Sequence, residues 1–203
     1  GSFNNKVRSN FIGYFRDNTL PDSLQEVGVL IEPTSGTANR IGEDIADAGN
    51  FIGYNNSGII IDGINDQTVY NNLIGLDTSG TVAYSNAFEG IVLENGAATN
   101  QIGNTGAFQS NVISGNGNGI LITGSGTSAN YIYGNNIGMN LAQSADVANG
   151  VGFVIEAGAS GNHIGADNNT GNAISGNYIG GIISGAGTTL NNVKSNLIGV
   201  LFP

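Results

Sequence analysis

The sequence predicts an all-β fold, a parallel β-helix of about six coils with three short strands in each coil. Residues 111–135, NVISGNGNGILITGSGTSANYIYGN, show the reasons. They contain three apolar segments, each too short for a helix and each with the branched or aromatic composition of a strand. Gly, Asn, Ser and Thr separate the segments and favour turns. This stretch therefore predicts one coil, and the rest of the sequence repeats it.

A tag, Asn-x-Ile-Gly, sets the period of the repeat. It begins at Asn10, Asn72, Asn135 and Asn196, in steps of 62, 63 and 61 residues. A second tag series divides each period into a long and a short coil. We expect one β-helix domain, residues 1–203, with three periods at about 10–71, 72–134 and 135–195. Both ends carry the same piece of the repeat and neither resembles a polar cap, so we expect a fragment of a longer array or end-to-end stacking.

Strand alternation assigns the inward side chains. An outward Glu94 places Ile91 and Leu93 inside, and the same alternation applies to every coil. Because parallel coils lie about 4.8 Å apart, corresponding residues stack on one another and form a continuous core. The three predicted core files are Ile12, Ile52, Ile74, Ile113, Ile137 and Ile174; Ile31, Ile61, Leu93, Ile122, Ile155 and Ile183; and Ile41, Val69, Ile102, Ile132, Ile164 and Val193.

Asparagine and glycine together make about a third of the chain, and the asparagines recur at the coil corners. A side-chain amide there can bond to its own backbone and to the amides above and below it, so we expect structural asparagine ladders. Asparagine also tolerates the left-handed backbone that a tight corner requires.

The pattern Asn-x-Ile-Ser-Gly-Asn … Gly-Ile-x-Ile … Asn-x-Ile-x-Gly-Asn-x-Ile-Gly resembles the right-handed parallel β-helix repeats of the pectin-lyase-like superfamily. The likeness is closest to repeats of large bacterial cell-surface and secreted proteins, and it covers essentially the whole chain. It implies a right-handed β-helix and an extracellular or cell-surface location. It implies no single activity, because that superfamily contains lyases, hydrolases, epimerases, phage tailspikes and adhesins.

Composition excludes several classes of protein. Charged residues are 10 % and apolar residues 39 % of the chain, which fits neither a disordered protein nor membrane insertion. A formal charge of −10 with only five Lys and Arg argues against nucleic acid as a partner. The chain has no cysteine, so a disulfide scaffold and a zinc–cysteine cluster are both excluded.

Carboxylates form one outward column on the second strands. Glu32, Asp62 and Glu94 are expected on adjacent coils, about 5 Å apart. This column is the candidate metal site, with Ca²⁺ as the possible cofactor, and it also has the spacing of a glycosidase carboxyl pair. The alternative is a solvated carboxylate row. A second acidic cluster lacks calcium-loop spacing and is expected to face solvent; it is Glu43, Asp44 and Asp47.

The long coils carry inserts after the first strand, at about residues 14–27, 76–90 and 139–150, which should emerge as stacked loops from one edge. The inserts contain the candidate carbohydrate-binding residues, because aromatic rings there could stack on sugars. These are Tyr14, Phe15, Tyr84 and Phe88.

Two outward files are apolar. An unbroken apolar stripe predicts either a cover formed by the inserts or a protein interface, such as a side-by-side oligomer. The candidate interface on the second strands is Leu30, Ile60, Val92, Leu121, Val154 and Ile182. The first strands add Phe11, Phe51, Leu73, Val112 and Leu197.

These observations favour a non-enzymatic, structural or adhesive segment of a bacterial extracellular or cell-surface protein. The alternative is a carbohydrate-active β-helix that binds or cleaves a glycan. A lyase would need a basic residue beside the acidic column, and none of the five Lys and Arg plainly reaches it. His163, the single histidine, has no partners for a catalytic triad and is expected to be exposed. The expected partners are an extracellular glycan, a cell-surface molecule or another copy of the chain.

Overall fold

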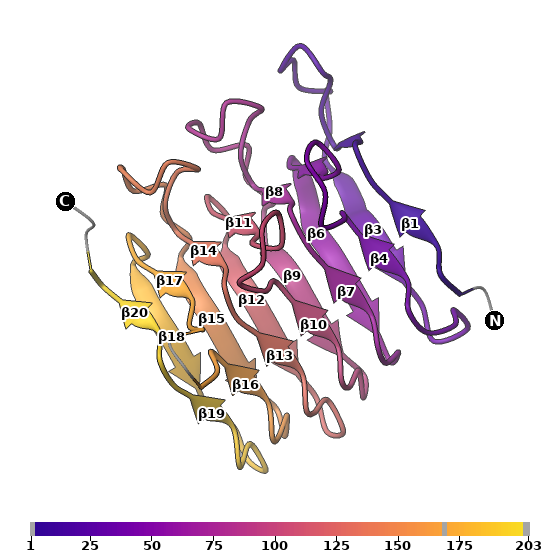
Figure 1. Cartoon of the computed structure of the whole chain (residues 1–203), viewed down its shortest axis with the longest axis vertical. Coiled ribbons are helices and arrows are strands. Elements are labelled where there is room, and N and C mark those ends of the chain that lie inside the picture. The colour runs from indigo at the N-terminus through magenta and orange to yellow at the C-terminus, as the bar shows by residue number, and fades with distance from the viewer. Residues whose placement is uncertain (1–2, 168–169, 201–203) are drawn as a thin grey trace.

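A computed structural model describes residues 3–167 and 170–200 and shows a parallel β-solenoid of about six turns (Figure 1). Every pairing between its 20 strands is parallel, and the strands form three sheets. The described residues form no helix. The predicted all-β fold with three strands per coil is therefore confirmed.

Each sheet takes one strand from every coil, so that strands neighbouring in a sheet are three apart in chain order. Sheet A contains β1 (Lys6–Val7), β4 (Arg40–Ile41), β7 (Thr68–Val69), β10 (Gln101–Ile102), β13 (Tyr131–Ile132), β16 (His163–Ile164) and β19 (Asn192–Val193). Sheet B contains β2 (Phe11–Ile12), β5 (Phe51–Ile52), β8 (Leu73–Ile74), β11 (Val112–Ile113), β14 (Asn136–Ile137), β17 (Ala173–Ile174) and β20 (Leu197–Ile198). Sheet C has the longer strands β3 (Gln25–Ile31), β6 (Asn55–Asp62), β9 (Glu89–Glu94), β12 (Asn118–Thr123), β15 (Val151–Glu156) and β18 (Ile179–Ile183).

The predicted aliphatic files form the core. They are buried along most of the solenoid, and Ile52, Ile74 and Ile113 have no exposed surface. Ile12 is only partly buried, while Ile183 and Val193 are exposed, because in the described structure each lies on a terminal coil with a neighbour on one side only. The core is thus built coil upon coil, as in other solenoids.

Asparagine ladders lie at all three corners of the coil. Along the corner before sheet B, each side-chain amide donates to the amide oxygen of the next coil; Asn72 donates to Asn111, and Asn111 donates to Asn135, at 3.0 and 2.9 Å. The predicted ladders are confirmed. In the ladder before sheet A, Gln67 takes the place of an asparagine and its side-chain oxygen accepts from Asn39 at 2.9 Å. A third ladder, before sheet C, is formed by Asn55, Asn86, Asn116, Asn149 and Asn177.

A file of glycines lies at the start of sheet C. Gly90 and Gly119 hold corresponding positions on neighbouring coils, since Glu89 pairs with Asn118 and Ile91 with Ile120. A Cβ atom on Gly90 would lie 2.7 Å from the carbonyl oxygen of Gly119 and 2.8 Å from Cγ2 of Ile113. The coils reach this separation only because no side chain is present there.

The three inserts project from one edge of the solenoid as stacked loops (Figure 1). The second and third inserts are hairpins closed by the antiparallel bridges Leu76↔Ala83 and Met139↔Asp146. Neighbouring inserts are joined by hydrogen bonds: Asn18 Nδ2 donates to Thr78 Oγ1 at 3.0 Å, and the Leu141 amide donates to the Gly80 carbonyl at 2.9 Å. The inserts therefore form a continuous ridge along the solenoid.

Candidate functional site

The outer face of sheet B, called the groove below, is the floor of two cavities, one over its first three strands and one over its last three, with the buried Val112 between them. The outward residue of each strand pairs in register with its counterpart on the next coil. Because every coil contributes one residue, the floor runs along the stack of coils. The file is Phe11, Phe51, Leu73, Val112, Asn136, Ala173 and Leu197.

Two families of loops wall this groove. The inserts, which follow the strands of sheet B, supply Arg16 and Leu141, and the turns that precede these strands supply Asp47 and Phe108. Over the first three coils they flank an open cavity of about 570 Å³. Phe108 and Leu141 are 52 % and 50 % exposed. This volume is within the range of sites that hold small ligands or short segments of polymers.

The aromatic floor has a specific geometry. The rings of Phe11 and Phe51 stack with centroids 4.9 Å apart and an interplanar angle of 12°. The Tyr14 ring meets Phe11 edge-on, and the guanidinium carbon of Arg16 lies 5.8 Å from the Phe11 centroid. The face that each phenyl ring turns toward the other is therefore occupied within the protein.

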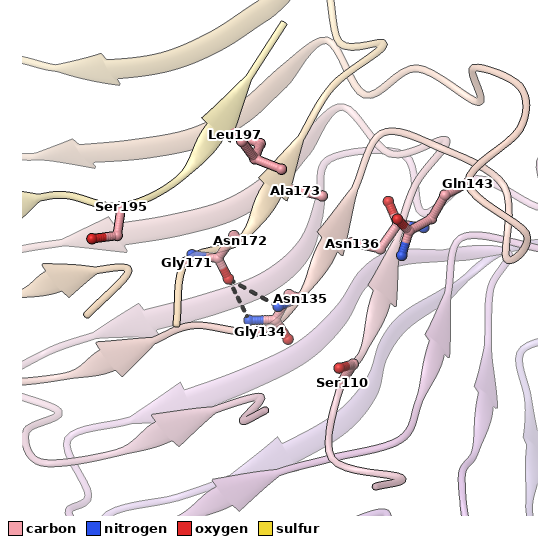
Figure 2. A pocket seen from close by; sticks show the side chains of 10 residues that line it. All are labelled: Ser110, Gly134, Asn135, Asn136, Gln143, Gly171, Asn172, Ala173, Ser195 and Leu197. Atoms are coloured by element: carbon pink, nitrogen blue, oxygen red, sulfur yellow. Dashed lines mark hydrogen bonds between the residues drawn. The ribbon is translucent and has the colours of Figure 1, made fainter. Parts of the chain in front are cut away.

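Toward the C-terminus the groove becomes polar (Figure 2). A smaller cavity of about 210 Å³ lies over β14, β17 and β20 and includes Ser110, Gln143 and Ser195. Asn136 interrupts the otherwise apolar floor here. Its Nδ2 donates to the Asn140 carbonyl at 2.9 Å, whereas its buried Oδ1 has no partner within the described structure. A buried acceptor without a donor is unfavourable, so this atom lowers the stability of the fold locally.

The corner ladder forms the back of this smaller cavity. In Figure 2 the Asn172 side-chain oxygen accepts from the backbone and side-chain nitrogens of Asn135, at 3.0 and 2.9 Å. These polar atoms are already paired. They contribute rigidity to the groove more than they contribute free binding groups.

A charge cluster lies beside the N-terminal coils. Lys6 and Arg8 pair with the carboxylate of Glu43, and Arg40 lies within 4.0 Å of the same carboxylate. The hydrogen bond from Lys6 lowers the pKa of Glu43, and the three cationic charges lower it further. The expectation that Glu43 faces solvent was wrong: it is 6 % exposed, because cations of the neighbouring coil converge on it.

Arg16 differs from the other cations. Lys194 pairs with Asp167 at 2.7 Å, and Arg40 also lies 3.6 Å from Asp44. Within the described residues, Arg16 has no carboxylate within ion-pairing distance. The groove therefore contains one cation whose charge no side chain of the described structure neutralises.

The residues of the acidic column lie on three adjacent coils. Asp62 and Glu94 are paired in register on β6 and β9, and the exposed Glu32 follows β3 on the adjacent coil. Burial and then repulsion from Asp62 and Glu89 raise the pKa of Glu94. Among the described residues, no three His, Cys, Asp or Glu side chains are arranged to hold a metal ion. In the described structure the column is therefore a partly solvated row of carboxylates in which Asp62 and Glu94 repel each other.

The aromatic candidates of the inserts have two different environments. Tyr14 is only 5 % exposed, donates to the Leu76 carbonyl at 3.1 Å and packs edge-on against Tyr84, whose hydroxyl donates to the Asn18 carbonyl at 2.7 Å. These two tyrosines hold the inserts together, and Tyr14 offers no ring face to a sugar. Phe15 and Phe88 are 59 % and 58 % exposed and remain accessible.

On sheet C, some side chains of the outward apolar file are buried by larger neighbours in the same file. Val92 and Val154 are 4 % and 7 % exposed although they point outward, because each lies between larger aliphatic side chains of the same file. Leu30, on the first strand of the sheet, is 48 % exposed. The remaining members, Ile60, Leu121 and Ile182, are partly exposed.

Sequence reasoning missed the loop residues of the groove. Arg16, Asp47, Phe108 and Leu141 lie far apart in the chain, and only the coil geometry brings them to one cavity. The available signal was the apolar outward file of the first strands, which lies between two loops in every coil. On sheet A, His163 is also not simply exposed; its ring stacks on Tyr131 with centroids 4.8 Å apart.

The described residues form no helix long and apolar enough to span a membrane. Comparison with known proteins identifies no relative: no family model, no curated protein and no solved structure matches this chain.

Proposed function

We propose that this chain is a non-enzymatic, adhesive β-solenoid segment of a bacterial extracellular or cell-surface protein, and that the groove over sheet B is its contact surface. One observation carries the proposal: the outward residues of sheet B form a file along the stack of coils, one from each, and cavities open over the first three and the last three of them. A surface of this shape suits an extended macromolecule better than a compact substrate.

The interior supports a structural role. Side-chain ladders satisfy the polar corners, and apolar files fill the core, so each coil is held rigidly by its neighbours. A rigid solenoid keeps the floor residues at a constant spacing of about 4.8 Å. The resemblance of the tags to β-helix repeats of bacterial surface and secreted proteins agrees with this role and supplies the expected location.

The test is binding to a panel of purified extracellular polysaccharides and cell-surface proteins. Leu73→Lys places a charge on the groove floor, and Tyr131→Lys places the same charge on the outer face of sheet A. We expect the wild type and Tyr131→Lys to bind the same member of the panel and Leu73→Lys to lose it. Equal loss in both variants, or no saturable binding of any member, would contradict the proposal.

A glycan-active protein is the second candidate. The exposed rings of Phe15 and Phe88 favour it, since an accessible aromatic ring is a stacking surface for a sugar. An assay for unsaturated uronates and new reducing ends separates the two candidates, because turnover would require an enzyme. Binding of a glycan that is lost in Phe15→Ala and Phe88→Ala, without turnover, would instead make this chain a glycan-binding adhesin.

A further inference from the structure

We propose that the cavity over β2, β5 and β8 binds an extended peptide in which an acidic residue adjoins a large apolar side chain. The proposal rests on the adhesive function above and names the chemistry of its partner. It is carried by the apolar floor, by the exposed apolar walls and by the unneutralised charge of Arg16.

The apolar part of the cavity has the length of a short peptide. Phe11, Phe51 and Leu73 lie on three successive coils, so they span two inter-coil steps, or about 10 Å. An extended peptide advances about 3.3 Å per residue, and about three residues cover this distance. Phe108 and Leu141 rise beside the floor and are half exposed. An apolar side chain seated between them would remove both from water, which is favourable.

Charge selects an acidic neighbour for that side chain. The chain has a formal charge of −10, so most of its surface repels anions. Arg16 lines the cavity, lies over the Phe11 ring and has no carboxylate partner in the described structure. A carboxylate of the ligand would supply this partner through a charge-assisted hydrogen bond.

Asp47 on the opposite wall favours a peptide over a hydrocarbon, and the stacked rings of the floor disfavour a sugar. Within the described residues its carboxylate accepts no hydrogen bond, and a peptide backbone brings N–H donors along its whole length. A hydrocarbon chain would leave both charged walls without partners. A sugar would find no free platform between Phe11 and Phe51, because these rings stack on each other.

The experiment is a selection of random heptapeptides displayed on phage, with the whole chain as bait. We expect enriched sequences in which Asp or Glu adjoins Phe, Leu, Ile or Tyr. The affinity of an enriched peptide is then compared with that of its acid-to-amide counterpart, on the wild type and on Arg16→Gln. Lys194→Gln is the control, since Lys194 is an ion-paired cation that does not line the cavity.

Replacing the acid of the peptide by its amide should weaken binding about five- to tenfold, and so should Arg16→Gln in the protein. Both changes together should weaken binding no more than either one alone. Lys194→Gln should bind like the wild type. The proposal is overturned if no sequence is enriched, if the enriched sequences lack acidic residues, or if Arg16→Gln binds them unchanged. If a polysaccharide binds this groove and no peptide is selected, the proposal of a peptide ligand fails, but the proposed adhesive function is unaffected. If neither binds, both fail.

Discussion

The asparagine ladder at the corner before sheet B makes the sharpest prediction, at its middle rung, Asn111. This side chain has no exposed surface. Its oxygen accepts from the backbone nitrogen and from Nδ2 of Asn72, both at 3.0 Å. Its own Nδ2 donates to the Val69 carbonyl at 2.8 Å and to Asn135 Oδ1 at 2.9 Å. Asn111→Ala removes all four hydrogen bonds.

The size of the destabilisation by Asn111→Ala depends on which of the former partners keep another hydrogen bond. Asn72 Nδ2 still donates to the carbonyls of Ile41 and Tyr70, Asn135 Oδ1 still accepts from the backbone of residue 111, and the Val69 carbonyl still accepts from the Gly103 amide. The backbone N–H of Asn72 is left buried without its acceptor. An orphaned donor costs about 1–3 kcal/mol and the remaining lost bonds about 1 kcal/mol more, so we expect a destabilisation of about 2–4 kcal/mol.

Urea unfolding followed by circular dichroism measures this loss, and hydrogen–deuterium exchange localises it to β8, β11 and β14. Asn118→Ala is the matched control, because Asn118 lies on the same coil, is only partly buried and makes no side-chain hydrogen bond in the described structure. We expect Asn118→Ala to change stability by less than about 0.5 kcal/mol. If the two variants are equally stable, the ladder does not stabilise the fold as argued.

The remaining predictions concern packing, charge and the inserts. Gly90→Ala should destabilise by about 1–3 kcal/mol in urea, because its Cβ meets backbone, whereas Gly106→Ala, which meets only the flexible end of a glutamine, should not. The pKa of Glu43 is lowered in the fold, so its ionised carboxylate stabilises the protein above the unfolded value of 4.5, and this stabilisation is lost as the pH falls through the lower folded value. In thermal melts, the melting temperature of Glu43→Gln should therefore not show this loss of stability at acidic pH. The pKa of Glu94 is raised, so its ionisation destabilises the fold as the pH rises above 4.5, and Glu94→Gln should gain melting temperature at pH 7 but not at pH 4. Tyr84→Phe removes the hydroxyl bond to the Asn18 carbonyl, and amide exchange in the first insert should accelerate while the core is unchanged.

Much of the fold could be predicted from local pattern alone. A tag such as Asn-x-Ile fixes a corner and an inward aliphatic residue at once, and its repetition predicts stacked ladders and core files, as the structure confirms for Asn111 and Ile113. Gln67 was missed because its longer side chain replaces an asparagine in the ladder without the tag. The glycine file was missed because glycine is required there by the close approach of a carbonyl oxygen from the next coil, and the sequence of one repeat does not show this contact.

The candidate site could be predicted only in part. The apolar floor follows from alternation, since Phe51 and Leu73 directly precede inward isoleucines. The walls depend on where irregular loops fold, and the periodicity of strands says nothing about this. The environment of Glu43 could not be predicted from local sequence either. Glu43 is buried because Lys6 and Arg8, more than thirty positions away, approach it from the preceding coil.

Site-specific blocking tests the claim that the groove over sheet B is the contact surface. The chain has no cysteine, so Leu73→Cys and Tyr131→Cys each introduce a single site for a bulky maleimide. Binding of the partner identified from the panel or the peptide selection is measured before and after labelling. We predict that labelling at residue 73 abolishes binding and that labelling at residue 131 leaves it unchanged. Full binding by the protein labelled at residue 73 would contradict the assignment of the groove.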